Sequence, residues 1–378
     1  MGEYEILRLL WWVVLGVLLG GFAIMDGFDL GTAILLPVIG RTDMDRRIMI
    51  NTVGPVWEGN QVWLILGAGA IFAAWPALYA VAFSGFYLAM LLLLLSLILR
   101  PVGFKFRGKL ADTRWRTAWD TALFIAGLVP ALVFGVALGN TLQGVPFRFD
   151  DTLRMTYGGT LFDLFNPFAL LAGLVSVAMM VMHGAAWLAC KTEAPLRPRA
   201  RHAGMIAALV LVVLFVLAGL WAERLDFYVV QSFAGTDAPS NPLTKQVSRA
   251  AGALLRNYAI MPVALVAPSL GLLGALGAAA LLATGRCVLA FCCSAIAIAG
   301  VVATAGVSLF PFLLPSSLDP NASLTVWDAS SSETTLLVMT IVVALLLPIV
   351  LLYTAFIYRV LRGPVTEATL AADGHDSY

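Results

Sequence analysis

The sequence predicts an all-α, polytopic integral membrane protein with about nine transmembrane helices. Of its 378 residues, 61% are hydrophobic and only 12% are charged, and the mean hydropathy is +0.92. Soluble globular domains use about 25% charged residues. Apolar stretches of about 20 residues, the length that crosses a bilayer, recur along the chain. No long polar region separates them, so we expect residues 1–378 to form a single integral membrane domain.

Nine apolar stretches of this kind follow one another along the sequence. They cover residues 7–36, 57–74, 78–100, 119–139, 165–190, 204–223, 260–283, 288–312 and 335–358. An odd number of crossings places the two termini on opposite sides of the membrane. We expect eight of the nine helices to form two four-helix bundles and the ninth to lie at the periphery.

The distribution of Lys and Arg predicts the orientation. If the N-terminus is outside, the inner connections contain most of the 23 basic residues, including the cluster from Arg100 to Arg116. The outer connections 140–164, 224–259 and 313–334 are long and polar. Because basic connections stay in the cytoplasm, we expect an outer N-terminus and a cytoplasmic C-terminus. The formal net charge of +1 implies no nucleic-acid partner.

Three carboxylates interrupt the first two apolar stretches. Asp26 and Asp29 lie in Ala23-Ile-Met-Asp-Gly-Phe-Asp-Leu-Gly31, and Glu58 lies in Gly54-Pro-Val-Trp-Glu-Gly-Asn-Gln-Val-Trp63. A charge at the centre of a membrane helix costs about 2.5–3.5 kcal/mol, so these acids require partners or a function. At about 1.5 Å per residue, all three reach a similar depth in the cytoplasmic half. We predict that they form one protonatable cluster on a proton or water path.

Polar neighbours could support this cluster. Gln61 shares a helical face with Glu58 and with Trp57. Arg100 ends the third apolar stretch, where it either extends to the membrane interface or forms an ion pair with Asp29 or Glu58. The structural alternative is that each acid hydrogen-bonds to a neighbouring helix or pairs with Arg100, and no proton moves.

Few other polar residues could carry chemistry. Asp120 lies at the beginning of the fourth stretch, where we expect a helix-capping role. Of three histidines, only His183 lies in an apolar stretch; His202 lies in an inner connection and His375 in the short polar tail after Gly363. We expect His183 to be packed or to face water rather than to bind a metal. A haem held by two histidines cannot be built from this set, and no P-loop, dinucleotide fingerprint, zinc-protease motif or nucleophile elbow is present. The chain is therefore not expected to be an enzyme by itself.

Many further stretches match one protein family, in order along the chain. They are Gly21–Leu30, Arg46–Asn51, Trp57–Trp63, Phe72–Pro76, Ala82–Tyr87, Arg100–Phe104, Gly139-Asn140, Gln143–Phe147, Asn166–Phe168, Ser240–Pro242, Phe310–Phe312, Pro315–Ser317 and Asn321–Asp328. Over essentially its whole length the sequence resembles subunit II of the bacterial cytochrome bd quinol oxidase. Its longer outer connections are similar to those of the branch that uses ubiquinol.

The resemblance implies nine helices in a bacterial inner membrane, with a periplasmic N-terminus. It implies a haem-bearing partner, subunit I, which holds haem b558, haem b595 and haem d, and small single-helix accessory subunits. In this family the complex oxidises quinol near the outer face and reduces oxygen to water with protons from the cytoplasm. Subunit II has no haem of its own. It contributes a proton-uptake path and, in some members, binds a structural quinone such as ubiquinone.

Positions that match the family's acidic sites are Asp29 and Glu58, with Arg100 and Asp120 beside them. The sequence departs from the common pattern at two positions, because members often have Asp where this chain has Glu58, and His where it has Val56. Glutamate keeps the carboxylate, whereas the missing histidine argues against a relay assisted by it.

Two other classes of function stay open. A proton-coupled secondary transporter would also have buried acids in helices interrupted by glycine. It should purify alone and move a substrate. A purely structural scaffold would hold the haem subunit in place, and Glu58→Gln should then leave turnover intact.

Overall fold

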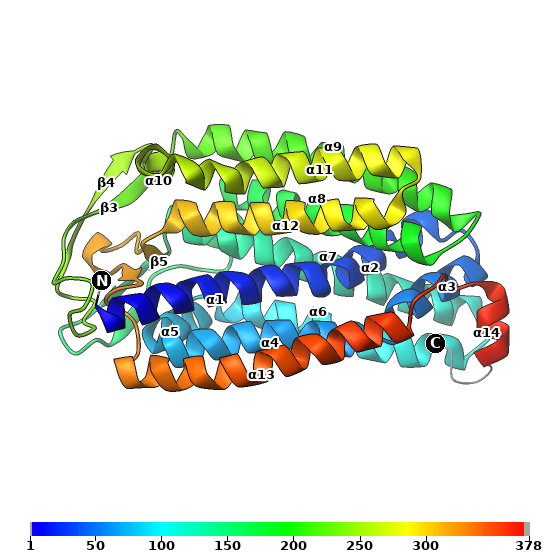
Figure 1. The fold of residues 1–378 in the computed structure, drawn as a ribbon, viewed down its shortest axis with the longest axis horizontal. Helices are drawn as coiled ribbons and strands as arrows, with labels where there is room; N and C mark the ends of the chain where they lie inside the picture. The colour runs from blue at the N-terminus through cyan, green and yellow to red at the C-terminus, as the bar shows by residue number, and fades with distance from the viewer. Residues whose placement is uncertain (1, 374–378) are drawn as a thin grey trace.

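The computed structural model describes residues 2–373 and is almost entirely helical (Figure 1). The α-helices are α1 (Glu3–Met25), α2 (Gly27–Ile39), α3 (Asp43–Val53), α4 (Trp57–Ala74), α5 (Pro76–Gly85), α6 (Tyr87–Phe106), α7 (Thr113–Gln143), α8 (Pro167–Lys191), α9 (Leu196–Ala222), α10 (Arg256–Ile260), α11 (Val266–Thr284), α12 (Cys287–Leu309), α13 (Glu333–Val360) and α14 (Glu367–Asp373). The strands are β1 (Phe147–Phe149), β2 (Met155–Tyr157), β3 (Asp226–Ser232), β4 (Gln246–Ala251), β5 (Phe312–Leu314) and β6 (Leu324–Thr325).

Within residues 2–373, eight helical segments are long and apolar enough to cross a membrane. The predicted stretch 57–74 is not among them, although it forms the 18-residue helix α4. The polar residues Glu58, Asn60 and Gln61 near its beginning lower its apolar character. In Figure 1, α4 nevertheless lies beside α13, and it packs against both α1 and α13. With α4, residues 2–373 contain nine helical segments of at least 18 residues, eight of them apolar enough to cross a membrane.

The helices form two groups and one peripheral member, as the sequence predicts. In the first group, α4 packs on α1, α6 packs on α7, and α7 packs on α2. The second group is a closed bundle in which α8, α9, α11 and α12 contact one another in a ring. The α2 helix joins the groups because it contacts both α7 and α8. The α13 helix lies on α1 and α4 and is the least buried of the eight apolar segments.

Two predicted stretches are broken in the structure. The first, 7–36, is interrupted at Asp26, where α1 ends and α2 begins. The third, 78–100, was predicted as one helix. The structure divides it into α5, which ends at Gly85, and α6, which begins at Tyr87 and continues to Phe106. Trp75 has an extended φ of −137° before Pro76, the first residue of α5. A proline disfavours the helical conformation of the residue before it and starts a helix well, so α5 begins as a separate helix.

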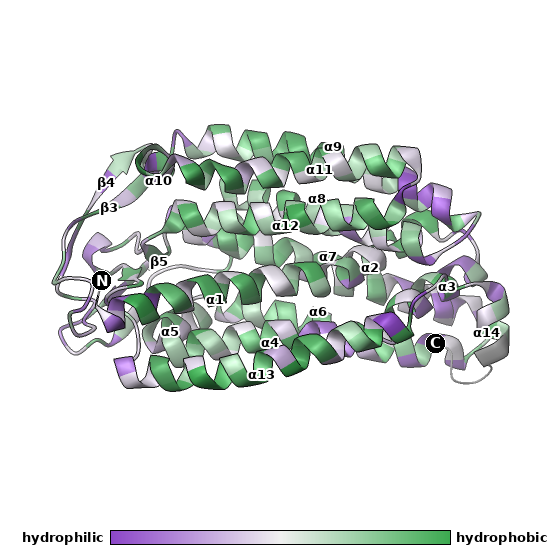
Figure 2. Cartoon of the chain, in the orientation of Figure 1, coloured by the Kyte–Doolittle hydropathy of each residue, from purple (hydrophilic) through white to green (hydrophobic). Residues whose placement is uncertain are grey.

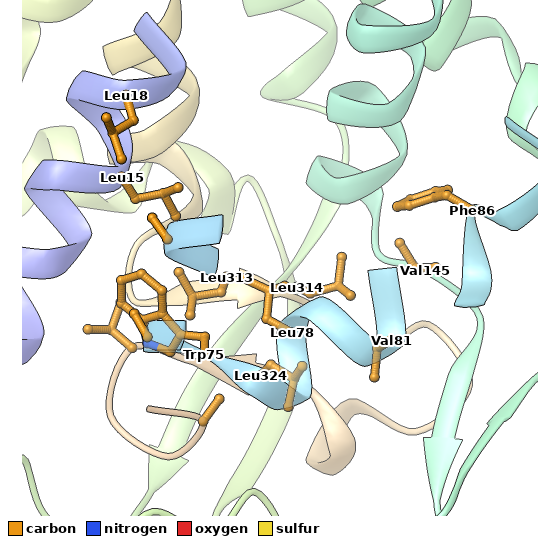
Figure 3. Close-up of a cluster of buried hydrophobic side chains, with 14 of the residues drawn as sticks. Leu15, Leu18, Trp75, Leu78, Val81, Phe86, Val145, Leu313, Leu314 and Leu324 are labelled. Carbon is orange, nitrogen blue, oxygen red and sulfur yellow. The ribbon is translucent and has the colours of Figure 1, made fainter. Parts of the chain in front are cut away.

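The outer connections form three short antiparallel hairpins that the all-α prediction did not include: β1 with β2, β3 with β4, and β5 with β6. In Figure 1 they lie at the end where the chain begins. Apolar side chains from the helices and from the β5–β6 hairpin form one buried cluster, in which Trp75 lies near Leu313 and Leu324 (Figure 3). This packing explains why long polar connections are ordered rather than loose.

A buried arginine ties the same end together. Arg8 of α1 donates to Ser330 Oγ at 2.7 Å and to the carbonyl oxygens of Thr236 and Ala238 at 2.5 and 2.9 Å. Nearby, Lys245 forms an ion pair with Asp328 at 2.9 Å. Burial lowers the pKa of Lys245, and the negative charge of Asp328 opposes part of that change.

The opposite end is basic. Figure 2 shows hydrophilic residues gathered at both ends of an apolar middle. The residues at this end include Arg41, Arg46 and Arg47 before and within α3, and Lys105 and Arg107 after the membrane part of α6. They lie on the side predicted to be cytoplasmic. The polar tail also forms structure there, because Val365 N donates to the Lys191 carbonyl at 2.8 Å and α14 follows. His375 lies outside the described residues.

A buried pair of carboxyl groups at a helix break

The break between α1 and α2 places two acids inside the protein. Asp26 is the junction residue and Asp29 lies in the first turn of α2; their exposed fractions are 0% and 2%. Asp and Gly favour helix interiors less than most residues, so Asp26-Gly27 is a natural place for the break. The backbone nevertheless stays continuous, because Asp26 N donates to the Phe22 carbonyl at 2.9 Å and Leu30 N to the Asp26 carbonyl at 3.0 Å.

His183 of α8 supports the break from the second bundle. It is fully buried, and its Nε2 lies 3.0 Å from the carbonyl oxygen of Ile24, one turn before the acids. Its Nδ1 lies 2.7 Å from Ser294 Oγ on α12, and its ring stacks on Phe291 at 4.5 Å. Both ring nitrogens are therefore occupied within the protein. The prediction of a packed histidine is confirmed.

Arg100 does not pair with Asp29 or Glu58, which corrects the predicted partners. It binds Asp26 through both carboxylate oxygens: Nη1 contacts Oδ1, and Nη2 donates to Oδ2 at 3.0 Å. Both side chains are buried, at 1% and 0% exposure. A bidentate pair of this kind is among the stronger protein ion pairs, and it compensates the charge of one acid with that of one guanidinium. Asp26 is thus held by a charged partner, whereas Asp29 is held by a neutral one.

Asp29 has a different environment. Its Oδ2 accepts a hydrogen bond from Asn60 Nδ2 of α4 at 2.9 Å. Its Oδ1 is buried and has no hydrogen-bond partner within residues 2–373. Asn60 Oδ1 in turn accepts from the hydroxyl of Tyr358 of α13 at 2.7 Å. The three side chains form a chain of hydrogen bonds across α2, α4 and α13, and no cation of the described chain forms a salt bridge with Asp29.

The structure buries two of the three acids of the predicted cluster and leaves the third exposed. Glu58 is exposed on α4, whereas Asn60, two residues later, is 1% exposed and contacts Asp29. Residues two apart on an α-helix point about 200° apart, so only one of them can face inward. Gln61, one turn from Glu58, is partly exposed, and Trp57 is buried with its ring 5.8 Å from Phe104. Glu58 therefore lies on the surface of the isolated chain, whereas Asp26 and Asp29 are buried.

Asp120 is not a helix cap, because α7 begins seven residues earlier and Asp112 caps it by accepting from Arg114 N at 2.9 Å. Asp120 accepts instead from Arg46 at 2.7 Å and from Arg107 at 2.5 Å. The 3₁₀ helix η1 (Arg107–Lys109) supplies the second arginine.

The same network continues to α3. Arg107 and Arg116 donate to the two oxygens of Asp43, at 2.9 and 2.7 Å. Alternating acids and arginines thus join α3, η1 and α7 at the basic end of the molecule. This arrangement compensates the charge of the buried Asp120 and Arg107.

The described residues do not fit a haem or metal centre. Among them, no group of three or more His, Cys, Asp or Glu side chains is placed to hold a metal ion. His183 already uses both ring nitrogens, and His202 is exposed at the basic end. The described part of the chain therefore offers two buried acids between helices, and no haem ligand pair is present among its residues.

Comparison with known proteins identifies the family. The family model described as cytochrome bd terminal oxidase subunit II matches residues 7–361. The chain belongs to this family. A subunit II relative from Escherichia coli strain K12, named cytochrome bd-I ubiquinol oxidase subunit 2, is 50% identical over 379 residues and covers 100% of both chains. The cytochrome bd ubiquinol oxidase subunit 2 of Bacillus subtilis is 32% identical and covers 95% of this chain and 96% of its own.

A solved structure supports the subunit II fold. It is titled the structure of bd oxidase from Geobacillus thermodenitrificans, and one of its chains matches with a TM-score of 0.68 at 18% identity. The match covers 94% of this chain and 98% of that one. At this identity the likeness shows the fold alone. With the family model, it establishes a multi-pass subunit of a bacterial cytochrome bd oxidase in the inner membrane.

Two site residues were missed by sequence reasoning. Asn60 lies in the stretch that drew attention to Glu58, but a neutral amide beside an acid gave no sign that it would face inward. Tyr358 lies near the cytoplasmic end of the last apolar stretch, where an aromatic side chain is usual for interfacial anchoring. The helical spacing from Trp57 and Trp63, both buried, could have indicated the inward face of α4.

Proposed function

We propose that this chain is the haem-free half of a quinol:oxygen oxidoreductase and supplies its proton-uptake path. The family pairs subunit II with a haem-bearing subunit I, in which we place haem b558, haem b595 and haem d. The E. coli and B. subtilis relatives are both named ubiquinol oxidase, so we propose ubiquinol as the electron donor of the complex. Membership of the family also leads us to propose a structural quinone and single-helix accessory subunits. We further propose that residues 1–378 form a single membrane domain.

The free oxygen of Asp29 is the observation that carries the proton path. Asp26 is already compensated by Arg100, so moving a proton onto Asp26 would disrupt a buried ion pair. Asp29 is held only by the neutral Asn60, and its Oδ1 has no partner within residues 2–373. Asp29 can therefore gain or lose a proton while the surrounding contacts stay in place. Water could bind at buried polar atoms that have no hydrogen-bond partner in the described chain. These atoms are Arg100 Nε, Thr32 Oγ1 and Asp29 Oδ1.

Glu58 fits a role at the boundary with the partner subunit. It is exposed on α4 at a depth where lipid contact would cost about 2.5–3.5 kcal/mol. A partner that offers water or a polar group at this position would remove that cost. We therefore propose that protons enter at the network around Asp120, are held at Asp29, and leave the chain towards the haem subunit near Glu58.

Two substitutions test the proton path in the assembled two-subunit oxidase. Asp29→Asn and Glu58→Gln should each lower quinol-supported oxygen consumption at least several-fold, because each removes a group that can carry a proton. Haem content, measured from the absorption spectrum of the purified complex, should stay normal. Asp151→Asn, at an exposed position of the β1–β2 loop, is the matched control and should change neither quantity.

The other classes of function predict different results. If haem is lost in parallel with activity, the two acids serve assembly and the proton path is wrong. If turnover stays intact in both variants, the chain is a scaffold. A transporter would purify without the haem subunit and move a substrate by itself.

A further inference from the structure

Tyr358 is joined to Asp29 through one intermediate side chain. Its hydroxyl donates to Asn60 Oδ1 at 2.7 Å, and Asn60 Nδ2 donates to Asp29 Oδ2 at 2.9 Å. An amide side chain has one acceptor end and one donor end. When the hydroxyl of Tyr358 donates to the acceptor end, the donor end must face Asp29.

We propose that Tyr358 is a positioning residue that holds the Asn60 amide with its NH₂ group towards Asp29, so that the proton carried by Asp29 resides on Oδ1. The inference rests on the proposed function, in which Asp29 is the acid that exchanges a proton. Asn60 occupies Oδ2 as a donor, which leaves Oδ1 as the oxygen that can take up a proton. Without Tyr358, the Asn60 amide could rotate and present its oxygen to Asp29 instead.

The ring of Tyr358 is held by the elements that form the site. It lies edge-on to Phe28 at 6.4 Å and to Trp187 at 5.9 Å. Phe28 immediately precedes Asp29 on α2, and it also stacks on Trp187 at 4.3 Å. The position of the hydroxyl is thus fixed relative to Asp29 by a shared set of aromatic contacts.

The remainder of α13 shows why this contact is specific. Tyr353 and Phe356 are 65% and 61% exposed, and the helix is the least buried apolar segment of the described chain. A phenylalanine would pack against Phe28 and Trp187 as well as a tyrosine does. The hydrogen bond to Asn60 therefore explains why position 358 has a hydroxyl group, because a polar group removed from water without a partner costs free energy.

Tyr358 can affect Asp29 only through Asn60, because the charged side chains nearby do not bind its hydroxyl group. Asp26 and Arg100 are paired with each other, so neither uses the hydroxyl of Tyr358. In the described chain the only hydrogen bond recorded for that hydroxyl is the one to Asn60. An effect of removing it should therefore depend on Asn60.

The test is Tyr358→Phe in the purified two-subunit oxidase, with Tyr353→Phe on the same helix as control. Turnover should fall roughly fivefold, the factor that corresponds to about 1 kcal/mol for one hydrogen bond. The infrared carbonyl band of protonated Asp29, identified as the band that Asp29→Asn removes, should move to higher frequency because Oδ2 no longer accepts a hydrogen bond. Tyr353→Phe should change neither quantity.

A double-mutant cycle separates positioning from packing. If Tyr358 acts through Asn60, Asn60→Ala with Tyr358→Phe should have the same turnover as Asn60→Ala alone. Additive losses, or an unmoved infrared band in Tyr358→Phe, would overturn the inference. If instead Asp29→Asn itself keeps full turnover, the proposed proton path fails, and this outcome is distinct from a failure at Tyr358.

Discussion

Asp26 and Asp29 show how two identical side chains, three residues apart, acquire different chemistry. Arg100 binds both oxygens of Asp26, whereas Asp29 receives one neutral hydrogen bond from Asn60. Removing one member of a buried ion pair leaves the other charge without compensation, at a cost of about 3–5 kcal/mol. Loss of the Asp29 charge does not leave a buried cation without its partner, because Arg100 is paired with Asp26. We therefore propose that Asp26 serves assembly and Asp29 serves proton exchange.

Asp26→Asn should destabilise the oxidase far more than Asp29→Asn, because only the first leaves Arg100 buried without its carboxylate. Thermal stability of the detergent-solubilised complex, followed by size-exclusion chromatography, measures the difference. Replacing both members of the pair, as in Asp26→Leu with Arg100→Met, should recover part of the loss. Equal stability of the two single Asn variants would contradict the division of roles.

The α2 helix holds this site because it crosses α8 very closely. A Cβ atom added at Gly184 of α8 would lie 2.5 Å from the backbone nitrogen of Thr32, and one added at Gly31 would collide with the carbonyl oxygen of Met180. Small residues at such a crossing let two backbones approach, which in a membrane replaces the missing hydrophobic driving force. The crossing brings His183 to the Ile24 carbonyl and so fixes the break from which Asp26 and Asp29 project.

Gly184→Val should push α2 from α8 and prevent assembly of a stable complex. Gly219→Val is the matched control, since nothing lies within 4 Å of a Cβ at Gly219 on the exposed face of α9. The yield of haem-loaded complex after purification measures both. Normal yield from Gly184→Val would show that the crossing tolerates separation.

The whole molecule is organised as long helical segments between a hairpin-covered end and a basic end. The hairpins β1–β2, β3–β4 and β5–β6 share the end where α1 begins, and the Asp43, Asp120 and arginine network occupies the other (Figure 1). Because basic connections stay in the cytoplasm, the acid network faces the side that supplies protons.

Labelling of single added cysteines tests this orientation in cells. Asp151→Cys, exposed between β1 and β2, should react with a membrane-impermeant maleimide from the periplasmic side. Gly108→Cys, exposed in η1, should react only after the inner membrane is opened. The parent chain, which has Cys190, Cys287, Cys292 and Cys293, gives the background. Reversed labelling would contradict the orientation.

The sequence by itself determined the membrane class, the all-α fold and the family, and it predicts the orientation. These follow from properties that add up locally: apolar length, the count of basic residues in each connection, and ordered motifs such as Trp57–Trp63. It also identified Asp29 and Arg100 as unusual, because a charge in an apolar stretch is visible without a structure.

Only the tertiary structure decided which groups meet. The rotation of α4 about its axis turns Asn60 inward and Glu58 outward, and hydropathy does not encode that angle when polar residues occupy both faces. The partners are also distant in sequence: Arg100 is 74 residues from Asp26, and Tyr358 is 298 residues from Asn60. Such pairings depend on how whole helices pack. The sequence therefore supplied the acids, and the packing of α2, α4, α6 and α13 assigned their partners.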